Sequence, residues 1–177
     1  GYAVFDALLD NSAQVYVLEL SSFQLERLPM LGAHAATILN ISEDHLDRYP
    51  SFDDYIAAKQ KIFSGCKNKI IPAGDAMCDS PETNAKTYCY GFKQGLDVFA
   101  KNLADGSFDI YCENKVLLNS KNLKIKGKHN IANVMAALCL ALTWVRDSNA
   151  LAKAAMAFAG LEHRCQWVAN IAGVEFY

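Results

Sequence analysis

Two short apolar runs near the start of the chain constrain its fold more than any other feature. One spans residues 15–20 (V-Y-V-L-E-L) and the other residues 35–40 (A-A-T-I-L-N). Neither run alternates strictly between apolar and polar residues, which is typical of strands buried on both faces of a parallel sheet. A short helix is expected over residues 22–27, ending near Pro29. We therefore predict two parallel strands that are neighbours or near neighbours in one sheet.

The next segments continue this strand–helix alternation. Residues 52–63 read as a helix, with Ser51 as its N-cap and with Asp53 and Asp54 placed to favour its positive end. Residues 69–71 (K-I-I) resemble a third strand. The sequence therefore predicts an α/β fold with a mostly parallel sheet flanked by helices.

The middle of the chain has a different pattern. Between residues 86 and 118, short β-prone pieces are separated by Gly91, Gly95 and Gly106. This spacing predicts a small antiparallel β subdomain built of hairpins. Alanine-rich helices are expected over residues 130–145 and 148–158, with Gly160 available to end the second.

Composition excludes several classes of protein. Hydrophobic residues make up 52% of the 177 residues and charged residues 20%, so a sizeable core is expected. The net charge of −2 gives no support for a nucleic-acid or anionic-membrane partner, and no apolar run approaches the roughly 20 residues that span a bilayer. The six cysteines are scattered without a C-x-x-C pair, which indicates buried thiols and a cytoplasmic location.

Acidic and imidazole side chains follow the two apolar runs. Glu19 closes the first run, and His45 lies in the segment after the second, residues 40–48 (N-I-S-E-D-H-L-D-R). Ligands gather beyond the carboxyl ends of parallel strands, and an acid at that position often holds magnesium. We expect Glu19 and His45 to share one edge of the sheet. Glu19 could instead be a structural hydrogen-bond acceptor, and His45 part of a capped helix start.

Lys59 lies on the apolar side of its predicted helix. Tyr55, Lys59, Ile62 and Phe63 fall on one face, whereas Lys61 lies away from it. Burying an unpaired ammonium is costly, so Lys59 either extends towards solvent or takes part in chemistry.

A second group of polar residues lies at the start of the first alanine-rich helix. Asn130 and Asn133 are three residues apart after the glycine turn at Gly127, and their amides suit an adenine edge. Asn130 could equally be an N-cap. Further on, Arg164 could reach a phosphate or face solvent.

Taken together, these stretches resemble the Mur ligases, which build peptidoglycan precursors. Five motifs occur in the family's order: E-L-S-S-F-Q-L with the residues around it, N-I-S-E-D-H-L-D-R, Y-I-A-A-K, G-K-H-N-I-A-N and G-L-E-H-R, at residues 19–25, 40–48, 55–59, 127–133 and 160–164. The form at residues 19–25 is most similar to members that add D-glutamate to UDP-N-acetylmuramoyl-L-alanine. The resemblance covers residues 15–167.

The resemblance implies an ATP-dependent amide-bond ligase that is cytoplasmic and monomeric. It would phosphorylate the substrate carboxylate to an acyl phosphate, which the amine of D-glutamate would then attack. By similarity, Glu19 would hold one Mg²⁺. His45 would hold a second Mg²⁺ together with Lys59 modified by carbon dioxide to a carbamate, and an unmodified Lys59 would pair with an acid or reach solvent.

The remaining site residues are also assigned by similarity. Ser21, Gln24 and His45 would face UDP-N-acetylmuramoyl-L-alanine. Asn130 and Asn133 would contact adenine. Arg164 would contact the nucleotide phosphates.

The chain departs from the family pattern in two respects: it lacks the phosphate loop, and it lacks the upstream strand, the substrate-binding domain and nearly all of the C-terminal domain. The family's phosphate loop, G-T-N-G-K followed by Ser or Thr, is expected before Gly1, and this sequence contains no equivalent. We therefore expect residues 1–165 to be the central ATP-binding domain without its phosphate-loop segment, and residues 166–177 to begin a C-terminal domain. By itself, such a chain is expected to lack ligase activity.

Two other interpretations stay open at this point. One is a ligase similar to folylpolyglutamate synthetase, which shares the architecture, although residues 19–25 argue against it. The other is a non-catalytic binding module that has kept the fold.

Overall fold

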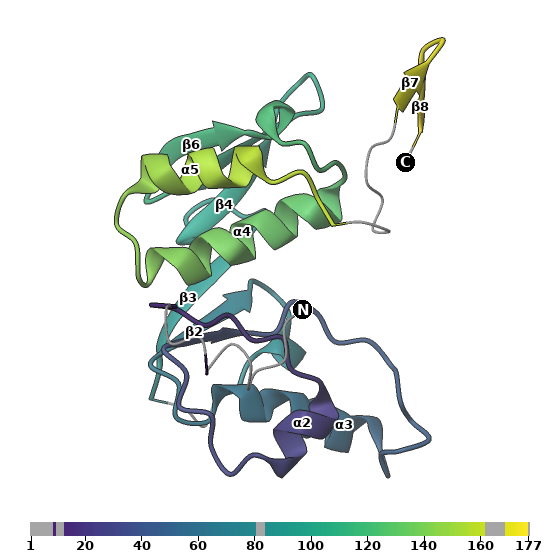
Figure 1. The fold of residues 1–177 in the computed structure, drawn as a ribbon, viewed down its shortest axis with the longest axis vertical. Helices are drawn as coiled ribbons and strands as arrows, with labels where there is room; N and C mark the ends of the chain where they lie inside the picture. The colour runs from purple at the N-terminus through teal and green to yellow at the C-terminus, as the bar shows by residue number, and fades with distance from the viewer. Residues whose placement is uncertain (1–8, 10–12, 81–83, 162–168, 177) are drawn as a thin grey trace.

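Six strands form one continuous sheet in the computed structural model, which describes residues 9, 13–80, 84–161 and 169–176. The strands follow one another in the sheet in chain order (Figure 1). They are β1 (Ala35–Thr37), β2 (Asn68–Pro72), β3 (Lys86–Gly91), β4 (Val98–Asn102), β5 (Phe108–Cys112) and β6 (Lys115–Asn119).

The first four strands run parallel to one another. β1 pairs with β2 from Ala35↔Asn68 to Thr37↔Ile70, and β2 pairs with β3 along its whole length. β3 meets β4 through only two residue pairs. The expected mostly parallel sheet is therefore confirmed. β3 was predicted to belong to the antiparallel group, but the structure places it in the parallel part, because it lies between β2 and β4.

The antiparallel hairpins predicted for the middle of the chain are β4, β5 and β6. They extend the parallel sheet instead of forming a second one. Glu113 and Asn114 join β5 to β6 with φ values of 50° and 63°, which is the left-handed backbone that a tight two-residue hairpin turn requires. A second, two-stranded sheet contains only β7 (Ala169–Ile171) and β8 (Val174–Phe176).

The helices lie close to the positions that were predicted from the sequence. α2 (Ser22–Arg27) and α3 (Phe52–Gln60), followed by a 3₁₀ turn at Lys61–Phe63, match the two predicted early helices, and Ser51 is the N-cap of α3. α4 (Lys128–Leu142) and α5 (Ser148–Ala157) match the two alanine-rich stretches. The N-cap of α4 is Gly127, with φ 94°, so the alternative that Asn130 caps this helix is wrong.

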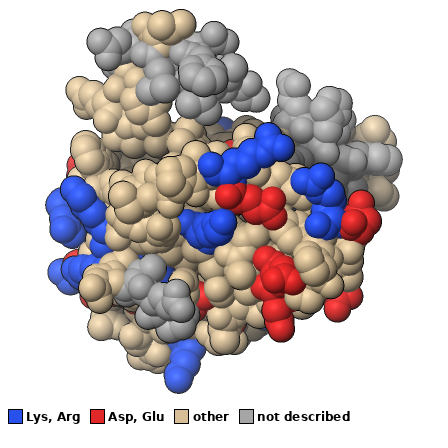
Figure 2. Space-filling model, turned by 90° about the horizontal axis from the view of Figure 1, so that it is seen from below, with Lys and Arg blue, Asp and Glu red and all other residues tan. Residues whose placement is uncertain are grey.

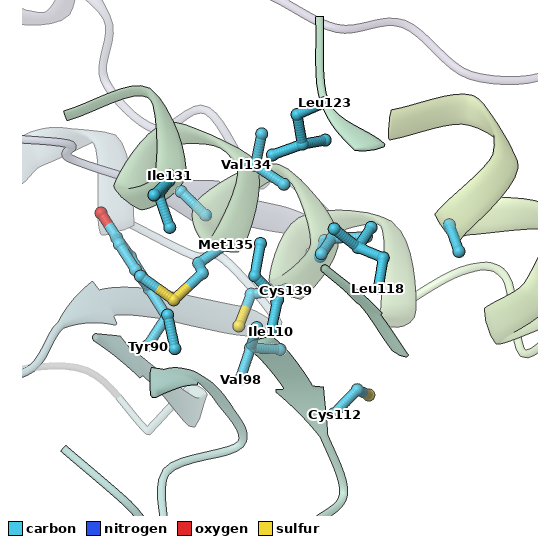
Figure 3. Close-up of a cluster of buried hydrophobic side chains, with 14 of the residues drawn as sticks. Tyr90, Val98, Ile110, Cys112, Leu118, Leu123, Ile131, Val134, Met135 and Cys139 are labelled. Carbon is cyan, nitrogen blue, oxygen red and sulfur yellow. The ribbon is translucent and has the colours of Figure 1, made fainter. Parts of the chain in front are cut away.

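Two apolar cores lie around the sheet. In the larger core, Met135 and Cys139 of α4 point towards Tyr90, Val98 and Ile110 of the strands (Figure 3). α4 contacts all four parallel strands, and α5 packs beside α4 and β6. The smaller core contains α3, the 3₁₀ turn after it and β1, with Phe63 fully buried. In Figure 1, α4 and α5 lie together, away from α2 and α3.

The predicted strand at residues 15–20 is absent from the structure, so its expected pairing with the second run is wrong. Val17 is 91% exposed and Val15 is 50% exposed. Within the described chain, residues 13–20 join no β-ladder. The physical reason is that no strand among the described residues lies beside this run. β1 is three residues long and pairs there with β2, and an apolar run becomes a strand only when a neighbour completes its hydrogen bonds.

Surface charge agrees with the balanced composition. Figure 2 shows basic and acidic side chains next to each other on the face seen from below. Among the described residues, no helix is long and apolar enough to cross a membrane.

Ile110→Ala should destabilise the chain by about 2–5 kcal/mol, because Ile110 is fully buried in the larger core and its removal leaves a cavity. Urea unfolding followed by circular dichroism measures this change. The matched control is Ile171→Ala in β7, where the side chain is 62% exposed, and we expect it to change stability by less than about 0.5 kcal/mol. Equal losses in the two variants would contradict this assignment of the core.

Candidate functional site

His45 lies in a tight turn after β1, in an unusual backbone conformation. Its φ is 55°, in the left-handed region that non-glycine residues seldom adopt. Its backbone N–H donates to Asp44 Oδ1 at 2.8 Å, and its carbonyl accepts from the Arg48 N–H at 2.9 Å. The imidazole Nε2 lies 3.5 Å from Asp44 Oδ2, and about half of the side chain is exposed. Such strained positions cluster at functional sites.

Lys59 reaches the same place from α3. The ring of Tyr55 is buried, with the Lys59 Nζ 5.1 Å from its centroid and the His45 ring centroid 6.3 Å away. The structure therefore places two of the predicted site residues, from different elements, near the same ring. Their proposed roles in metal binding and catalysis stay a prediction.

The face of α3 that carries Lys59 is the one predicted. Tyr55 and Ala58 are buried and Lys59 is half-buried, whereas Lys61 is exposed and donates from Nζ to the Glu26 carbonyl at 3.4 Å. The expected partner of an unmodified Lys59 was an acid or solvent. Within the described chain Lys59 forms no ion pair, and its ammonium lies over an aromatic face, a favourable position for a cation.

The end of α3 is fixed to the loop that follows β2. Gln60 Nε2 donates to the carbonyls of Met77 and Asp79 at 3.1 and 2.5 Å. Lys69, buried on β2, forms an ion pair with Asp79 and donates to the Ser80 carbonyl at 2.7 Å. A buried ammonium needs such pairing, and these bonds hold in place the helix that presents Lys59.

Ser21 and Gln24 hydrogen-bond to each other in the structure. Ser21 Oγ accepts from the Gln24 N–H at 3.3 Å, and Gln24 Oε1 accepts from the Ser21 N–H at 2.9 Å, which together make a capping box at the start of α2. Both side chains remain exposed. Their first structural role is therefore to begin α2, and any contact with substrate would be additional.

Glu19 lies in the exposed segment before α2, and the structure shows no hydrogen bond or ion pair that joins it to His45. Across the described residues, no group of three His, Cys, Asp or Glu side chains could hold a metal ion. The predicted ligand set contains only two such residues, Glu19 and His45, because its third ligand would be a modified lysine.

Asn130 and Asn133 are neighbours on the first turns of α4. Asn130 Nδ2 donates to the Lys126 carbonyl at 2.8 Å, and Asn133 Nδ2 lies 3.5 Å from Asn130 Oδ1. The two amides therefore lie on one side of the helix, as their three-residue spacing predicts. Arg164 lies outside the described residues.

A pocket of about 370 Å³ opens beside the start of α4, and no sequence pattern predicted it. Lys121 and Asp105 form an ion pair of 2.6 Å at its rim, and this lysine together with Ser107 holds the pKa of Asp105 well below its usual range. Its lining includes Lys128 and Ile131 but neither Asn130 nor Asn133. The pocket is therefore separate from the two predicted adenine-binding amides.

Sequence reasoning also missed an aromatic cluster around His45, formed by Phe23, Tyr49, Phe52 and Tyr55. Tyr49 stacks on Phe23 at 6.0 Å and contacts Tyr55 at 5.2 Å. Phe52 lies 6.2 Å from Tyr55. Three of the four rings fall within residues 49–55, which is the one signal that could have revealed the cluster.

Comparison with known proteins identifies the family to which this chain belongs. Residues 2–141 match the Mur ligase middle domain family, and the chain belongs to that family. It is 42% identical over 171 residues to the UDP-N-acetylmuramoylalanine–D-glutamate ligase of Marinobacter nauticus, covering 96% of this chain and 38% of that protein. Identity to the ligase of the same name from Pseudomonas aeruginosa is 40% over 173 residues, again covering 96% and 38%. The chain thus spans about two-fifths of the length of these curated relatives.

Solved structures agree on the fold. A pseudomurein peptide ligase type C from Methanothermus fervidus superposes with a TM-score of 0.65 at 19% identity, over 77% of this chain and 36% of that one. A MurC from Thermotoga maritima gives 0.60 at 20% identity, over 86% and 34%. A MurF from Acinetobacter baumannii gives 0.59 at 24% identity, over 77% and 31%. The resemblance inferred from the sequence motifs is therefore confirmed.

Cys78 makes the stability of this region depend on pH. Its thiol is fully buried near Lys59, and burial, reinforced by its hydrogen bond to Asp75 Oδ2, raises the pKa from 9.0 to about 12. The unfolded chain therefore loses this proton first, and stability should fall between pH 9 and pH 12, by up to about 1.4 kcal/mol per pH unit. Urea unfolding at several pH values should show a shallower fall for Cys78→Ala than for the parent chain. Identical slopes would contradict the assignment.

Proposed function

We propose that this chain supplies most of the nucleotide-binding middle domain of an ATP-dependent ligase that joins D-glutamate to UDP-N-acetylmuramoyl-L-alanine. The observation that carries the proposal is that His45 and Lys59 both lie near the Tyr55 ring, in a chain about 40% identical to ligases of that name. The reaction would take place in the cytoplasm, in a monomeric enzyme.

The reaction has two steps. The carboxylate of the L-alanine residue attacks the γ-phosphorus of ATP, which gives an acyl phosphate and ADP. The amine of D-glutamate then attacks the acyl carbon, an amide bond forms, and inorganic phosphate leaves with its electron pair while the amine loses a proton. Since little covalent chemistry falls to the protein in such phosphoryl transfer, positioning and charge stabilisation dominate.

The available side chains fit magnesium if Lys59 is modified. Glu19 offers a carboxylate and His45 a half-exposed imidazole, while Lys59 has no acidic partner within the described residues. The Lys59 ammonium would first lose one proton, and the neutral amine would then attack carbon dioxide and lose a second proton to give the carbamate. The added carbamate oxygens would supply the hard ligands that Mg²⁺ prefers. When bound, magnesium would neutralise charge on the phosphates of ATP.

The start of α4 would bind the adenine. The paired amides of Asn130 and Asn133 offer both donors and acceptors for the edge of the base, and Arg164 would bind the nucleotide phosphates. Ser21 and Gln24, at the exposed start of α2, would contact the muramoyl-alanine substrate beside His45.

We also propose that residues 1–165 belong to the middle domain and residues 166–177 to the beginning of a C-terminal domain. The separation of the β7–β8 hairpin from the six-stranded sheet supports this division.

The test uses the complete ligase, with ATP, magnesium, UDP-N-acetylmuramoyl-L-alanine and D-glutamate, and measures both phosphate release and the amide product. Phosphate release should require both UDP-N-acetylmuramoyl-L-alanine and D-glutamate. Lys59→Ala should lower kcat by a factor of about 10³ or more, because it removes a charge-stabilising ligand. Acetate or another short carboxylic acid should restore part of the activity by replacing the carbamate.

Lys61→Ala is the matched control, since Lys61 is two residues away, exposed, in the 3₁₀ turn that follows the helix. It should keep the parent kcat within about twofold, as surface changes usually do. A fully active Lys59→Ala enzyme, or a parent enzyme that forms no D-glutamate product, would refute the proposal.

A further inference from the structure

Phe23 contacts three residues of the turn that carries His45. Its ring centroid lies 5.1 Å from the His45 ring and 6.0 Å from the nearly parallel Tyr49 ring, while the Arg48 guanidinium carbon lies over it at 4.9 Å. The Phe23 side chain of α2 therefore contacts the rings of His45 and Tyr49 and the cation of Arg48.

The support beneath Phe23 is itself well fixed. On either side of it in α2, Ser22 and Leu25 are 3% and 2% exposed, and the capping box closes the first turn of the helix. Phe23 itself is half-buried, and its ring contacts residues of the turn. A short helix of six residues gains its rigidity from such burial and capping, because helices of this length are not stable alone.

The turn needs this external support. His45 has a left-handed backbone and a side chain that is about half exposed, and its acid partner, Asp44, is the residue next to it and lies in the same turn. Among the described residues, the aromatic rings of other elements that contact the His45 ring are Phe23 of α2 and Tyr55 of α3. The Lys59 ammonium lies over the Tyr55 ring, so a change at Tyr55 would affect both His45 and Lys59. A change at Phe23 would alter the ring contact with His45 and leave the cation–π contact of Lys59 in place.

We propose that Phe23 is a positioning residue, which sets the His45 imidazole for the reaction without contacting the reacting atoms. An aromatic ring is required because the Arg48 cation lies over the flat face of Phe23 and the imidazole lies tilted beside the ring, interactions that an aliphatic side chain of similar volume cannot reproduce. This inference rests on the proposed function.

The kinetic test compares Phe23→Leu and Phe23→Tyr in the complete ligase. Phe23→Leu should lower kcat by roughly 10- to 100-fold, with the KM values for ATP and both acceptor substrates changed less than about threefold, because a small misplacement of a catalytic group costs rate more than binding. Phe23→Tyr keeps the ring and should stay within about threefold of the parent kcat.

Phe52→Leu is the matched control. It removes a ring from the same aromatic cluster, one that contacts Tyr55 and makes no ring contact with His45. Its kcat should stay within about threefold of the parent value, even if its melting temperature falls as far as that of Phe23→Leu. The inference is overturned by an unchanged kcat in Phe23→Leu, by an equal loss of kcat in Phe52→Leu, or by a rise in KM alone, which would make Phe23 a substrate contact.

A spectroscopic measurement separates this inference from the proposed function. In the substrate-free ligase labelled with ¹³C-histidine, the His45 ring resonance, assigned by its loss in His45→Gln, should shift in Phe23→Leu by more than the loss of the Phe23 ring current accounts for, and stay in place in Phe52→Leu. If the parent enzyme forms no D-glutamate product, the proposed function fails, and this measurement still decides whether Phe23 positions the imidazole. A His45 resonance that does not move in Phe23→Leu refutes the positioning role even in an active enzyme.

Discussion

The packing of α4 across the parallel strands is the interaction on which the rest of the structure depends. Met135 and Cys139 are buried against side chains from β3, β4 and β5, and the helix contacts every parallel strand. A sheet with one uncovered face would expose its apolar residues, so this layer allows the strands to keep one order and one register. The same helix begins at Gly127 and presents Asn130 and Asn133 on its first turns.

The second layer, around α3, links this framework to the candidate site. Phe63 closes the smaller core, and Gln60 fixes the end of the helix to the loop after β2. As a result, Lys59 extends from a helix that is held both by the packing of the smaller core and by the hydrogen bonds of Gln60. A group that must be placed to within a fraction of an ångström is better held by packed secondary structure than by a free loop.

Local features of the fold could be predicted from the sequence, and pairings between distant segments could not. The helices were recognisable because their signals are local: Ser51 accepts from the Asp54 N–H as its spacing suggests, and Lys59 lies on the apolar face. Residues 15–20 have the composition of a strand, but strand formation depends on a neighbour that composition does not reveal. In the site, Lys59 was singled out by helical periodicity, whereas the role of Phe23 depends on contacts between α2 and the turn after β1, which local sequence patterns do not report.

The left-handed backbone at His45 has a consequence for how this position can vary. Glycine would adopt a φ of 55° without steric cost, and asparagine would tolerate it better than most residues, so the stability of the turn alone favours replacing the histidine. Keeping an imidazole there sacrifices of order 1 kcal/mol of folding free energy. A screen that rewards only heat resistance would therefore drift towards glycine or asparagine at this position and lose the ring. Under the role proposed for His45, a screen for activity would retain the imidazole and accept a less stable turn.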